Sequence, residues 1–595
     1  MVREILTNGE QTGSLHSFRI PSVCYALPEA LFILEFLLFL IGGIAYGFYF
    51  DLNPLETVLV GIVLLCAFRG WLPQFPITKA WQLWNRFARR QGRTVAAVFI
   101  LALVVRCALL PVLPVPKPAI TDEFSHLLLA DTLAHGRLTN PTHPMWVCFE
   151  SIHIIQKPTY NSDYFPGQGA MLALGELAGH PWVASLLLCA AMCAACCWAL
   201  QAWLPPAWAL FAGVLAILRF GIASYWINGY YGGCLGALGG ALAVGAYPRL
   251  LRKPSLGLSL ALGLGIAMIG YARPLEGLAV AVPIVALTAA AVFRGRVRFR
   301  FAIPSAAIVI GAVGFLLVYN KAVTGDSLKP PYAVNQATYG WPMTLPWFHP
   351  STPVFRHEEL RRYYEYEKLV HDRNASLFGT LKFSTTKLEE IWRFYFGPAF
   401  SVALVMLSAV WRSGRSRLLL IMGGLTVLVS LVETGTSPHY AACATACFLG
   451  IEMECLRRLS RYRHQGRNIG ISIVFAIPAI IALILIVRLG LGAAHLPYTQ
   501  RVNYLSWCCV KSSREDKAQI QAMLEKMPGQ HLVLVKPKSD PDNLFQWIYN
   551  AADIDGAKVV WARDMGDNDA LLRYFQGREV WELDPNVEPA RLSPR

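Results

Sequence analysis

Long apolar runs separated by short polar connections dominate the chain. Most runs approach the roughly 20 residues that a helix needs to cross the hydrocarbon core of a bilayer. Such runs predict transmembrane helices. Thirteen spans are predicted, at 29–50, 56–70, 94–113, 181–203, 206–226, 229–247, 255–271, 275–293, 301–319, 391–411, 417–433, 438–456 and 469–489. The pattern therefore predicts an α-helical polytopic membrane protein.

The basic residues alternate along the connections and predict an orientation. Arginine and lysine gather in every second short connection, at 86–93, 249–253, 294–300, 412–417 and 457–467. The connections between them, at 51–56, 228–233, 271–277 and 433–440, hold one basic residue, Arg273. Because basic connections stay in the cytoplasm, the N-terminus is predicted to be cytoplasmic and the C-terminus extracytoplasmic. The moderately apolar stretch 167–179 then has to be an outer juxtamembrane helix.

Composition agrees with this class and excludes others. Hydrophobic residues make up 55% of the 595 residues and charged ones 15%, which excludes a soluble globular protein. The net charge of +15 is spread between apolar runs, so no nucleic-acid partner is expected. The fourteen cysteines lie mostly within the runs, where a thiol packs as a small apolar group. The predicted location is a bacterial inner (plasma) membrane.

Three parts are predicted. Residues 1–93 form an N-terminal segment with two spans, and residues 94–489 form the main transmembrane domain, with outer loops 114–180 and 320–390. A surface helix is expected at 357–373. Residues 490–595 are predicted to be a small extracytoplasmic α/β domain, with a helix capped by Ser513 and strands at 531–535, 558–561 and 579–583.

The first outer loop carries an acidic pair, Asp122 and Glu123, at the start of a predicted helix that ends at Gly136. One reading is structural: Thr121 caps the helix and the two carboxylates complement its dipole. The other reading is catalytic, because acids at a membrane surface could meet a hydroxyl acceptor and a lipid-anchored donor. His126 shares a helix face with Asp122, which suits an acid–base pair or a divalent metal.

A second polar loop, at 157–169, leads into the predicted juxtamembrane helix. Asp163, Tyr164 and Gln168 are its candidates for substrate binding. The alternative is that its proline and glycine residues only shape a turn.

Two further outer connections carry charged or aromatic candidates. Arg273 and Glu276 lie in one of them, either as a structural ion pair or with Arg273 as a phosphate ligand. His439 and Tyr440 lie in the other, where a lone histidine is usually structural. The predicted topology brings all four clusters to one membrane face. Acids for deprotonation together with a cation for phosphate indicate group transfer from a lipid phosphate.

The order of these features resembles the GT-C membrane glycosyltransferases. A span is followed by an acidic pair in a large first loop and then by the segment Ala-Asp-Thr-Leu-Ala-His-Gly-Arg at 130–137. Segment 164–175 is similar to the loop and juxtamembrane helix of the protein O-mannosyltransferase and lipid A aminoarabinose transferase branch. Here Tyr-Phe-Pro replaces the usual Lys-Pro-Pro, and two spans precede the acid-bearing loop. The resemblance covers residues 94–488.

The resemblance implies a polyprenyl-phosphate sugar donor, a glycan, lipid or protein acceptor, and transfer with inversion. Asp122 takes the place of the family's catalytic base, and Arg273 and His439 would lie at the donor phosphate. The rival hypotheses are a transporter or lipid flippase, and a membrane protein that binds envelope polymers. Against a transporter, Arg106, Arg219 and Arg488 are expected near outer span ends, where their side chains would reach the surface.

Overall fold

The computed structural model describes residues 54–69, 71, 78–340, 345–348, 351, 353–435, 437–494, 505–509, 516–538 and 547–595. The predicted span 29–50 and the predicted cap at Ser513 lie outside these residues.

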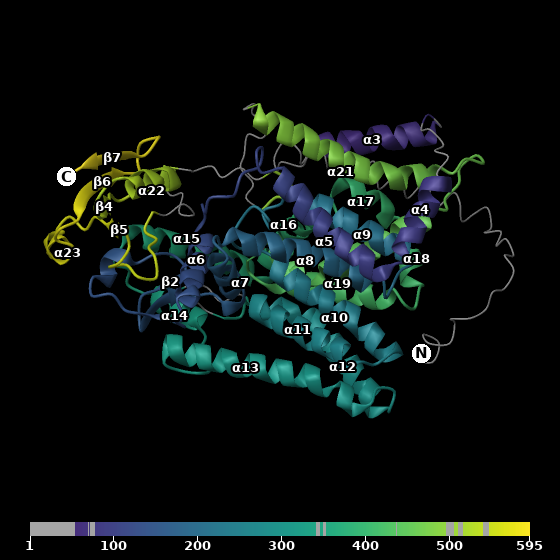
Figure 1. Ribbon diagram of the computed structural model, residues 1–595, viewed down its shortest axis with the longest axis horizontal. Coiled ribbons are helices and arrows are strands. Elements are labelled where there is room, and N and C mark those ends of the chain that lie inside the picture. Colours follow the sequence, from purple (N-terminus) through teal and green to yellow (C-terminus); the bar gives the residue numbers. More distant parts are fainter. Residues whose placement is uncertain are drawn as a thin grey trace.

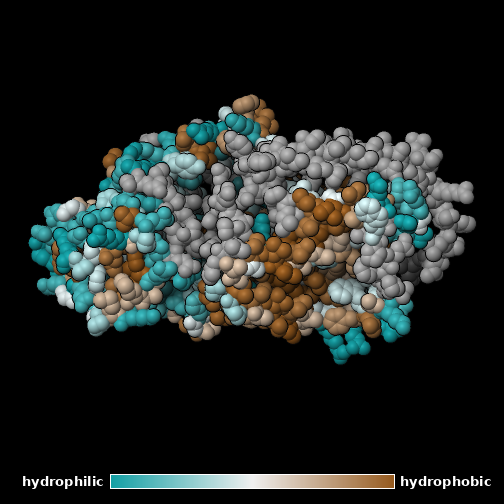
Figure 2. Space-filling view, turned by 90° about the horizontal axis from the view of Figure 1, so that it is seen from above, coloured by the Kyte–Doolittle hydropathy of each residue, from teal (hydrophilic) through white to brown (hydrophobic). Residues whose placement is uncertain are grey.

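Apolar helices form most of the described chain and run along the long axis of the molecule (Figure 1). Six of them are long and apolar enough to cross a membrane: α5 (Gln91–Ala108), α8 (Trp182–Leu200), α10 (Cys234–Arg252), α12 (Pro274–Phe293), α13 (Ile303–Thr324) and α21 (Ile469–Ala493). Shorter apolar helices are α3 (Pro54–Phe68), α9 (Pro206–Phe220), α11 (Leu256–Ala272) and α19 (Arg417–Val432). Apolar side chains gather in the middle of the face in Figure 2, between hydrophilic ends. A polytopic, mostly helical membrane protein is thereby confirmed, whereas the count of thirteen spans stays a prediction.

One predicted span, 391–411, is not a single helix. Helix α16 (Leu377–Tyr395) ends before Gly397, and the short helices α17 (Gly397–Leu404) and α18 (Leu407–Trp411) follow. Gly397 has a φ of 61°, and an added Cβ would lie 2.8 Å from the Arg219 guanidinium, so only glycine fits. Pro398 also lacks the N–H that a continuous helix would use. Residues 391–411 therefore have the composition of a transmembrane span, but their backbone is divided among the end of α16, α17 and α18.

The next predicted span, 438–456, begins as the 3-10 helix η3 (Pro438–Ala444) and continues as α20 (Thr445–Leu459). The connecting and surface helices are α4 (Thr78–Ala88) and the 3-10 turn η2 (Phe299–Phe301). Helix α13 begins at the same end of the molecule as the connection from α12 and ends beside α14, at the opposite end (Figure 1).

We call that opposite end, which carries α6, α7, α14, α15 and the C-terminal sheet, the loop end. Its elements are α6 (Thr121–Ala134), β1 (Asn140–Pro141), η1 (Trp146–Phe149), β2 (Ile154–Ile155), β3 (Thr159–Ser162), α7 (Pro166–Leu177), α14 (Pro331–Tyr339) and α15 (Glu358–Ala375). Strand β3 lies between β1 and β2 in an antiparallel arrangement. Helix α15 exposes a charged face and buries Tyr363, Tyr364 and His371. Asn374, the acceptor of a possible glycosylation sequon, is buried and donates to the Thr434 carbonyl at 3.1 Å.

The C-terminal segment forms a four-stranded sheet in the order β5-β4-β6-β7. Its elements are α22 (Asp516–Lys526), β4 (His531–Val535), β5 (Val559–Arg563), α23 (Asp569–Tyr574), β6 (Glu579–Asp584) and β7 (Arg591–Pro594). Strand β4 is parallel to β5 and β6, whereas β7 pairs antiparallel with β6. Leu532 and Leu534 share an apolar core with Phe149, Ile154 and Tyr160 of the first loop. The sheet is therefore packed on that loop, and its role as a separate extracytoplasmic domain stays a prediction.

Arg106 and Arg219 do not reach solvent as expected from the sequence. Both are fully buried near the ends of their helices. Arg106 donates to the Leu113 carbonyl at 2.8 Å and lies over the Trp182 ring. Arg219 lies 3.7 Å from the Glu56 carboxylate and over the Trp507 ring. These arginines hold helices and connections together.

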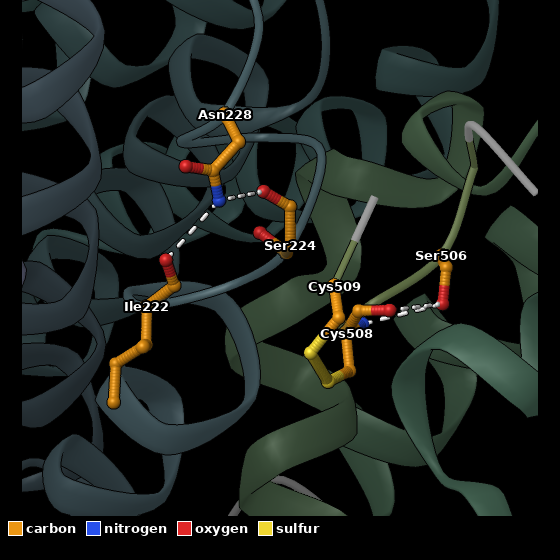
Figure 3. Close-up of a disulfide and its surroundings, with 6 residues drawn as sticks. All are labelled: Ile222, Ser224, Asn228, Ser506, Cys508 and Cys509. Carbon is orange, nitrogen blue, oxygen red and sulfur yellow. Dashed lines mark hydrogen bonds between the residues drawn. A yellow bond between two sulfur atoms is a disulfide. The ribbon is translucent and has the colours of Figure 1, made fainter. Parts of the chain in front are cut away.

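Cys508 and Cys509 form a disulfide with each other beside the turn that follows α9 (Figure 3). The Cys509 amide donates to the Ala223 carbonyl at 2.9 Å, and the Ser506 carbonyl accepts from the Tyr225 amide at 3.1 Å. This bond was not predicted from the sequence. The two backbone hydrogen bonds hold Ser506 and Cys509 against the turn.

Candidate active site

A cavity of about 1070 Å³ opens between the loop end and the ends of the apolar helices. Eight of the residues singled out from the sequence line it: Asp122, His126, Tyr164, Gln168, Arg273, Glu276, His439 and Tyr440. They come from α6, α7 and the loop before it, the α11–α12 connection, the first turn of α12, and η3. Residues up to 318 positions apart therefore share one cavity, as the predicted topology requires.

Asp122 is the acid that α6 supplies to this cavity. It lies in the first turn of α6, and its Oδ1 accepts a hydrogen bond of 2.5 Å from the Tyr164 hydroxyl. Burial raises the pKa of Asp122. The His153 charge, the Tyr164 hydrogen bond and the His126 and Arg273 charges together lower it by more, so the pKa lies below its usual value. Asp122 is therefore a carboxylate at neutral pH, which is the form that accepts a proton.

Glu123 lies outside the cavity lining, although the sequence made it a catalytic candidate beside Asp122. Its Oε2 accepts from the Ala119 amide at 2.7 Å and the Ile120 amide at 3.2 Å, and its Oε1 accepts from the Tyr230 amide at 3.1 Å. Glu123, rather than Thr121, thus satisfies the amides at the start of α6. Burial raises the pKa of Glu123 to about 7, against the effect of these bonds. We assign it a structural role.

His126 faces the cavity from the turn of α6 after Asp122 and stacks on the Tyr164 ring at 4.6 Å. Burial lowers the pKa of His126 to about 4, so it is neutral at pH 7. Its Nδ1 is buried and makes no hydrogen bond to any residue that the structure describes. A neutral imidazole with a free nitrogen is suited to ligand binding or to metal binding.

The metal predicted at Asp122 and His126 needs further ligands, and the structure does not supply them. Among the described residues, one group of three side chains has ligand atoms within 4.8 Å of one another: Asp131, His135 and Glu176. That group could hold a metal ion, but its members do not line the cavity. Two ligands do not fit a protein-held cation. We assign no metal to Asp122 and His126.

Arg273 lines the cavity from the one-residue connection between α11 and α12. Its Nη2 donates to His439 Nε2 at 2.8 Å, and His439 Nδ1 then faces the Tyr225 hydroxyl at 3.0 Å. The guanidinium also lies 3.8 Å from the centre of the Tyr440 ring. Its distance to Glu276 is longer, at 4.0 Å. His439 and Tyr440 therefore orient the cation, whose remaining donors are available to an anion.

Two other predicted residues are placed differently from what the sequence suggested. Asp163 is fully buried behind the cavity wall, where its Oδ2 lies 3.2 Å from His153 Nδ1. Gln168 lines the cavity but donates to the Tyr230 carbonyl at 3.0 Å, which fixes the start of α7. Both support the wall of the site in this structure.

Several lining residues were missed in the sequence. His153 sits in the turn before β2, Tyr363 and Glu367 lie on α15, and Lys387 lies on α16. Burial raises the pKa of Glu367 to about 7, although the His153 charge opposes this. The tyrosines at helical spacing in 357–373 were the one signal that a face of this helix is buried.

Comparisons with known proteins give structural neighbours only. No protein-family model matches the chain, and no curated protein does. ArnT from Cupriavidus metallidurans in the apo state matches with a TM-score of 0.42 and 13% identity over 82% of this chain and 92% of that one. The same protein bound to undecaprenyl phosphate gives a TM-score of 0.44 at 12% identity, with the same coverage. An oligosaccharyltransferase from Archaeoglobus fulgidus, in complex with Zn and sulfate, gives 0.40 at 11% identity over 73% of this chain and 60% of that one.

Both neighbours belong to the GT-C superfamily, the class of membrane glycosyltransferase that the sequence resembles. Matches at these scores do not establish a common function, which has to be inferred from the chain's own residues.

Proposed function

We propose that this protein is a glycosyltransferase that moves a sugar from a polyprenyl-phosphate donor to an acceptor hydroxyl at the membrane surface. The observation that carries the proposal is the single cavity that joins an ionised, hydrogen-bonded carboxylate, Asp122, to an oriented guanidinium, Arg273. Such a pair suits a displacement in which one end of the reaction loses a proton and the other releases an anion.

The proposed reaction is a single displacement. The acceptor hydroxyl gives its proton to Asp122 while the acceptor oxygen forms a bond to the anomeric carbon of the sugar. The bond from that carbon to the phosphate oxygen breaks, and the lipid phosphate leaves with the electron pair. The Arg273 guanidinium binds the departing phosphate, and attack opposite the leaving group inverts the anomeric centre. No step requires a metal ion.

The lining of the cavity also suits a lipid-anchored donor. Near Arg273 the wall contains Leu235, Ile269 and Leu275, which belong to the apolar helices α10, α11 and α12. Asp122 and His126 lie on α6, at the loop end. A donor whose phosphate meets Arg273 would keep its prenyl chain along the apolar wall and its sugar toward Asp122. We further propose that this face is extracytoplasmic, since the basic connections belong in the cytoplasm.

Mass spectrometry of lipids that copurify with the protein tests the donor class. The proposal expects a polyprenyl phosphate or its glycosylated form in the wild type and much less of it in Arg273→Ala. The matched control is Arg361→Ala, an exposed arginine on α15 that contacts Glu358 and Glu365 outside the cavity. A wild-type protein that retains only bulk phospholipid, and that transfers no sugar from any polyprenyl-phosphate donor in proteoliposomes, would overturn the proposal.

A further inference from the structure

His153 is a buried histidine of the cavity lining that the mechanism above leaves unused. It lines the cavity, is 3% exposed, and both of its ring nitrogens are engaged. Nδ1 lies 3.2 Å from Asp163 Oδ2, and Nε2 lies 3.1 Å from the Tyr363 hydroxyl. An imidazolium satisfies both contacts, since it donates one N–H to the carboxylate and the other to the hydroxyl.

The partner of His153 is placed to keep the ring charged. Asp163 is 0% exposed, and its other oxygen, Oδ1, has no hydrogen bond to the residues that the structure describes. A buried carboxylate with so few partners requires a cation beside it. The pKa of His153 is therefore raised: burial lowers it, but the Asp163 charge and hydrogen bond, with smaller effects from Asp122 and Glu367, outweigh the burial.

The backbone at His153 is held in an unusual conformation. Its φ is 61°, a left-handed value that is uncommon for a residue other than glycine. Its carbonyl accepts from the Ser125 hydroxyl at 2.6 Å, one turn after Asp122 on α6. The loop is thus tied directly to the helix that carries the proposed base.

The C-terminal segment holds the residues just before His153. The Tyr549 hydroxyl donates to the Ile152 carbonyl at 3.2 Å, and Arg563 Nη2 donates to the Glu150 carbonyl at 3.1 Å. The Ser151 hydroxyl donates to the Ile548 carbonyl. Three successive residues are therefore fixed by a part of the chain about 400 positions away, so a strained turn can persist at the site.

We propose that His153 is a positioning residue for Asp122: Asp163 holds it as an imidazolium, the Ser125 and C-terminal contacts hold its backbone, and its charge acts on the Asp122 carboxylate. The geometric link is Tyr164, whose ring lies 5.1 Å from the His153 ring and whose hydroxyl donates to Asp122. The inference rests on the proposed function only for its effect on rate, because the electrostatic pairing is a property of the folded protein. Its charge keeps the buried Asp122 ionised.

The titratable groups around His153 come from α6, from the loop after β3 and from α15. They are Asp122 and His126 on α6, Asp163 and Tyr164 after β3, and Tyr363 and Glu367 on α15. His126 is neutral at pH 7, so it adds no competing positive charge. Below its raised pKa, His153 therefore carries a positive charge on the loop-end side of the cavity.

A double-mutant cycle tests the pairing without any assay of activity. The four proteins are wild type, Asp122→Asn, His153→Gln and the double variant, and their thermal midpoints are measured in detergent at pH 6, where His153 is protonated. We expect Asp122→Asn to lower the midpoint in the wild-type background and to leave it unchanged or raise it in His153→Gln, where the carboxylate has lost its cation. Equal effects of Asp122→Asn in both backgrounds would overturn the pairing, whether or not the protein is a transferase.

If the protein transfers sugar, the pH profile adds a second readout. In His153→Gln the acid limb of the rate should move up by about one pH unit or more, because Asp122 becomes harder to ionise. Asp163→Asn should move the limb in the wild-type background and not in His153→Gln. Tyr549→Phe removes only the hydrogen bond to the Ile152 carbonyl, so it should give a smaller upward shift of the acid limb. The control is His143→Gln, a histidine of the same loop that lies 3.0 Å from Asp555 and outside the cavity. An acid limb that stays in place in His153→Gln would contradict the proposal.

Discussion

Replacing Glu123 by glutamine separates the roles of two adjacent acids. Asp122 faces the cavity, whereas Glu123 binds the amides of Ala119, Ile120 and Tyr230. Glutamine has nearly the same shape, but one of its two terminal atoms is an NH₂ group, which cannot accept. We expect Glu123→Gln to weaken the fold and to leave transfer by the folded protein close to the wild-type rate.

The size of the effect follows from the lost acceptor. The carboxamide would turn its nitrogen toward the Tyr230 amide, since the alternative loses two bonds instead of one. One buried amide without an acceptor costs about 1–3 kcal/mol of unfolding free energy. At pH 5 the folded Glu123 is protonated, but both of its oxygens can still accept, so this is the expected difference between Glu123→Gln and the wild type.

The difference should shrink as the pH rises. The folded pKa of Glu123 is about 7, above its value in the unfolded chain, so the folded wild type retains a proton that the unfolded chain has released. The contribution of Glu123 to the unfolding free energy is fully present below the pKa that Glu123 has in the unfolded chain. It falls by on the order of 3 kcal/mol as the pH rises to about 7. Glutamine does not titrate, so by pH 8 the gap should be closed or reversed.

Unfolding by SDS in mixed micelles at pH 5 and pH 8 measures both effects. The control is Glu365→Gln, which removes an exposed ion pair of 2.7 Å with Arg361 and should change stability by less than about 0.5 kcal/mol. If Glu123→Gln abolished transfer while its unfolding curves matched the wild type at both values of pH, Glu123 would be catalytic and its structural assignment wrong.

Three further outcomes are expected. Arg273→Lys should raise KM for the donor about tenfold or more, because an ammonium cannot reproduce the planar, stacked guanidinium; an unchanged KM in donor titrations would contradict the phosphate site. Tyr164→Phe should move the acid limb of the rate upward, since the pKa of Asp122 rises without the 2.5 Å hydrogen bond, and an unmoved limb would disprove that link. Arg219→Met should lower the unfolding free energy by about 3–5 kcal/mol, because Glu56 remains buried without its cation; a wild-type SDS unfolding curve would refute this.

The membrane architecture was predictable because a span requires a long apolar run, which composition shows directly. The run 391–411 shows the limit of that reasoning. Its residues are apolar enough to span, but the backbone breaks where Gly397 fits against the Arg219 guanidinium. That contact joins residues 178 positions apart, so no local pattern contains it.

The candidate site was predictable in outline because the alternation of basic connections brought distant polar residues to one face. It did not distinguish Asp122 from Glu123. Neighbours on a helix point about 100° apart, so the packing of α6 decides which acid meets the cavity. His153 was not predicted for a related reason. Its contacts are with Asp163 and with Tyr363, and Tyr363 lies on α15, 210 positions away.

Sugar transfer by Asp122→Asn in proteoliposomes is the most direct test of Asp122 as the catalytic base. The donor is a polyprenyl-phosphate sugar identified from the copurifying lipid, and the control is Asp326→Asn, an exposed aspartate outside the cavity. Donor binding is measured on the same samples. We expect Asp122→Asn to bind donor but to transfer sugar at least about 10²-fold more slowly than the wild type, whereas Asp326→Asn should transfer normally. Transfer by Asp122→Asn at the wild-type rate would contradict the assignment of Asp122 as the base.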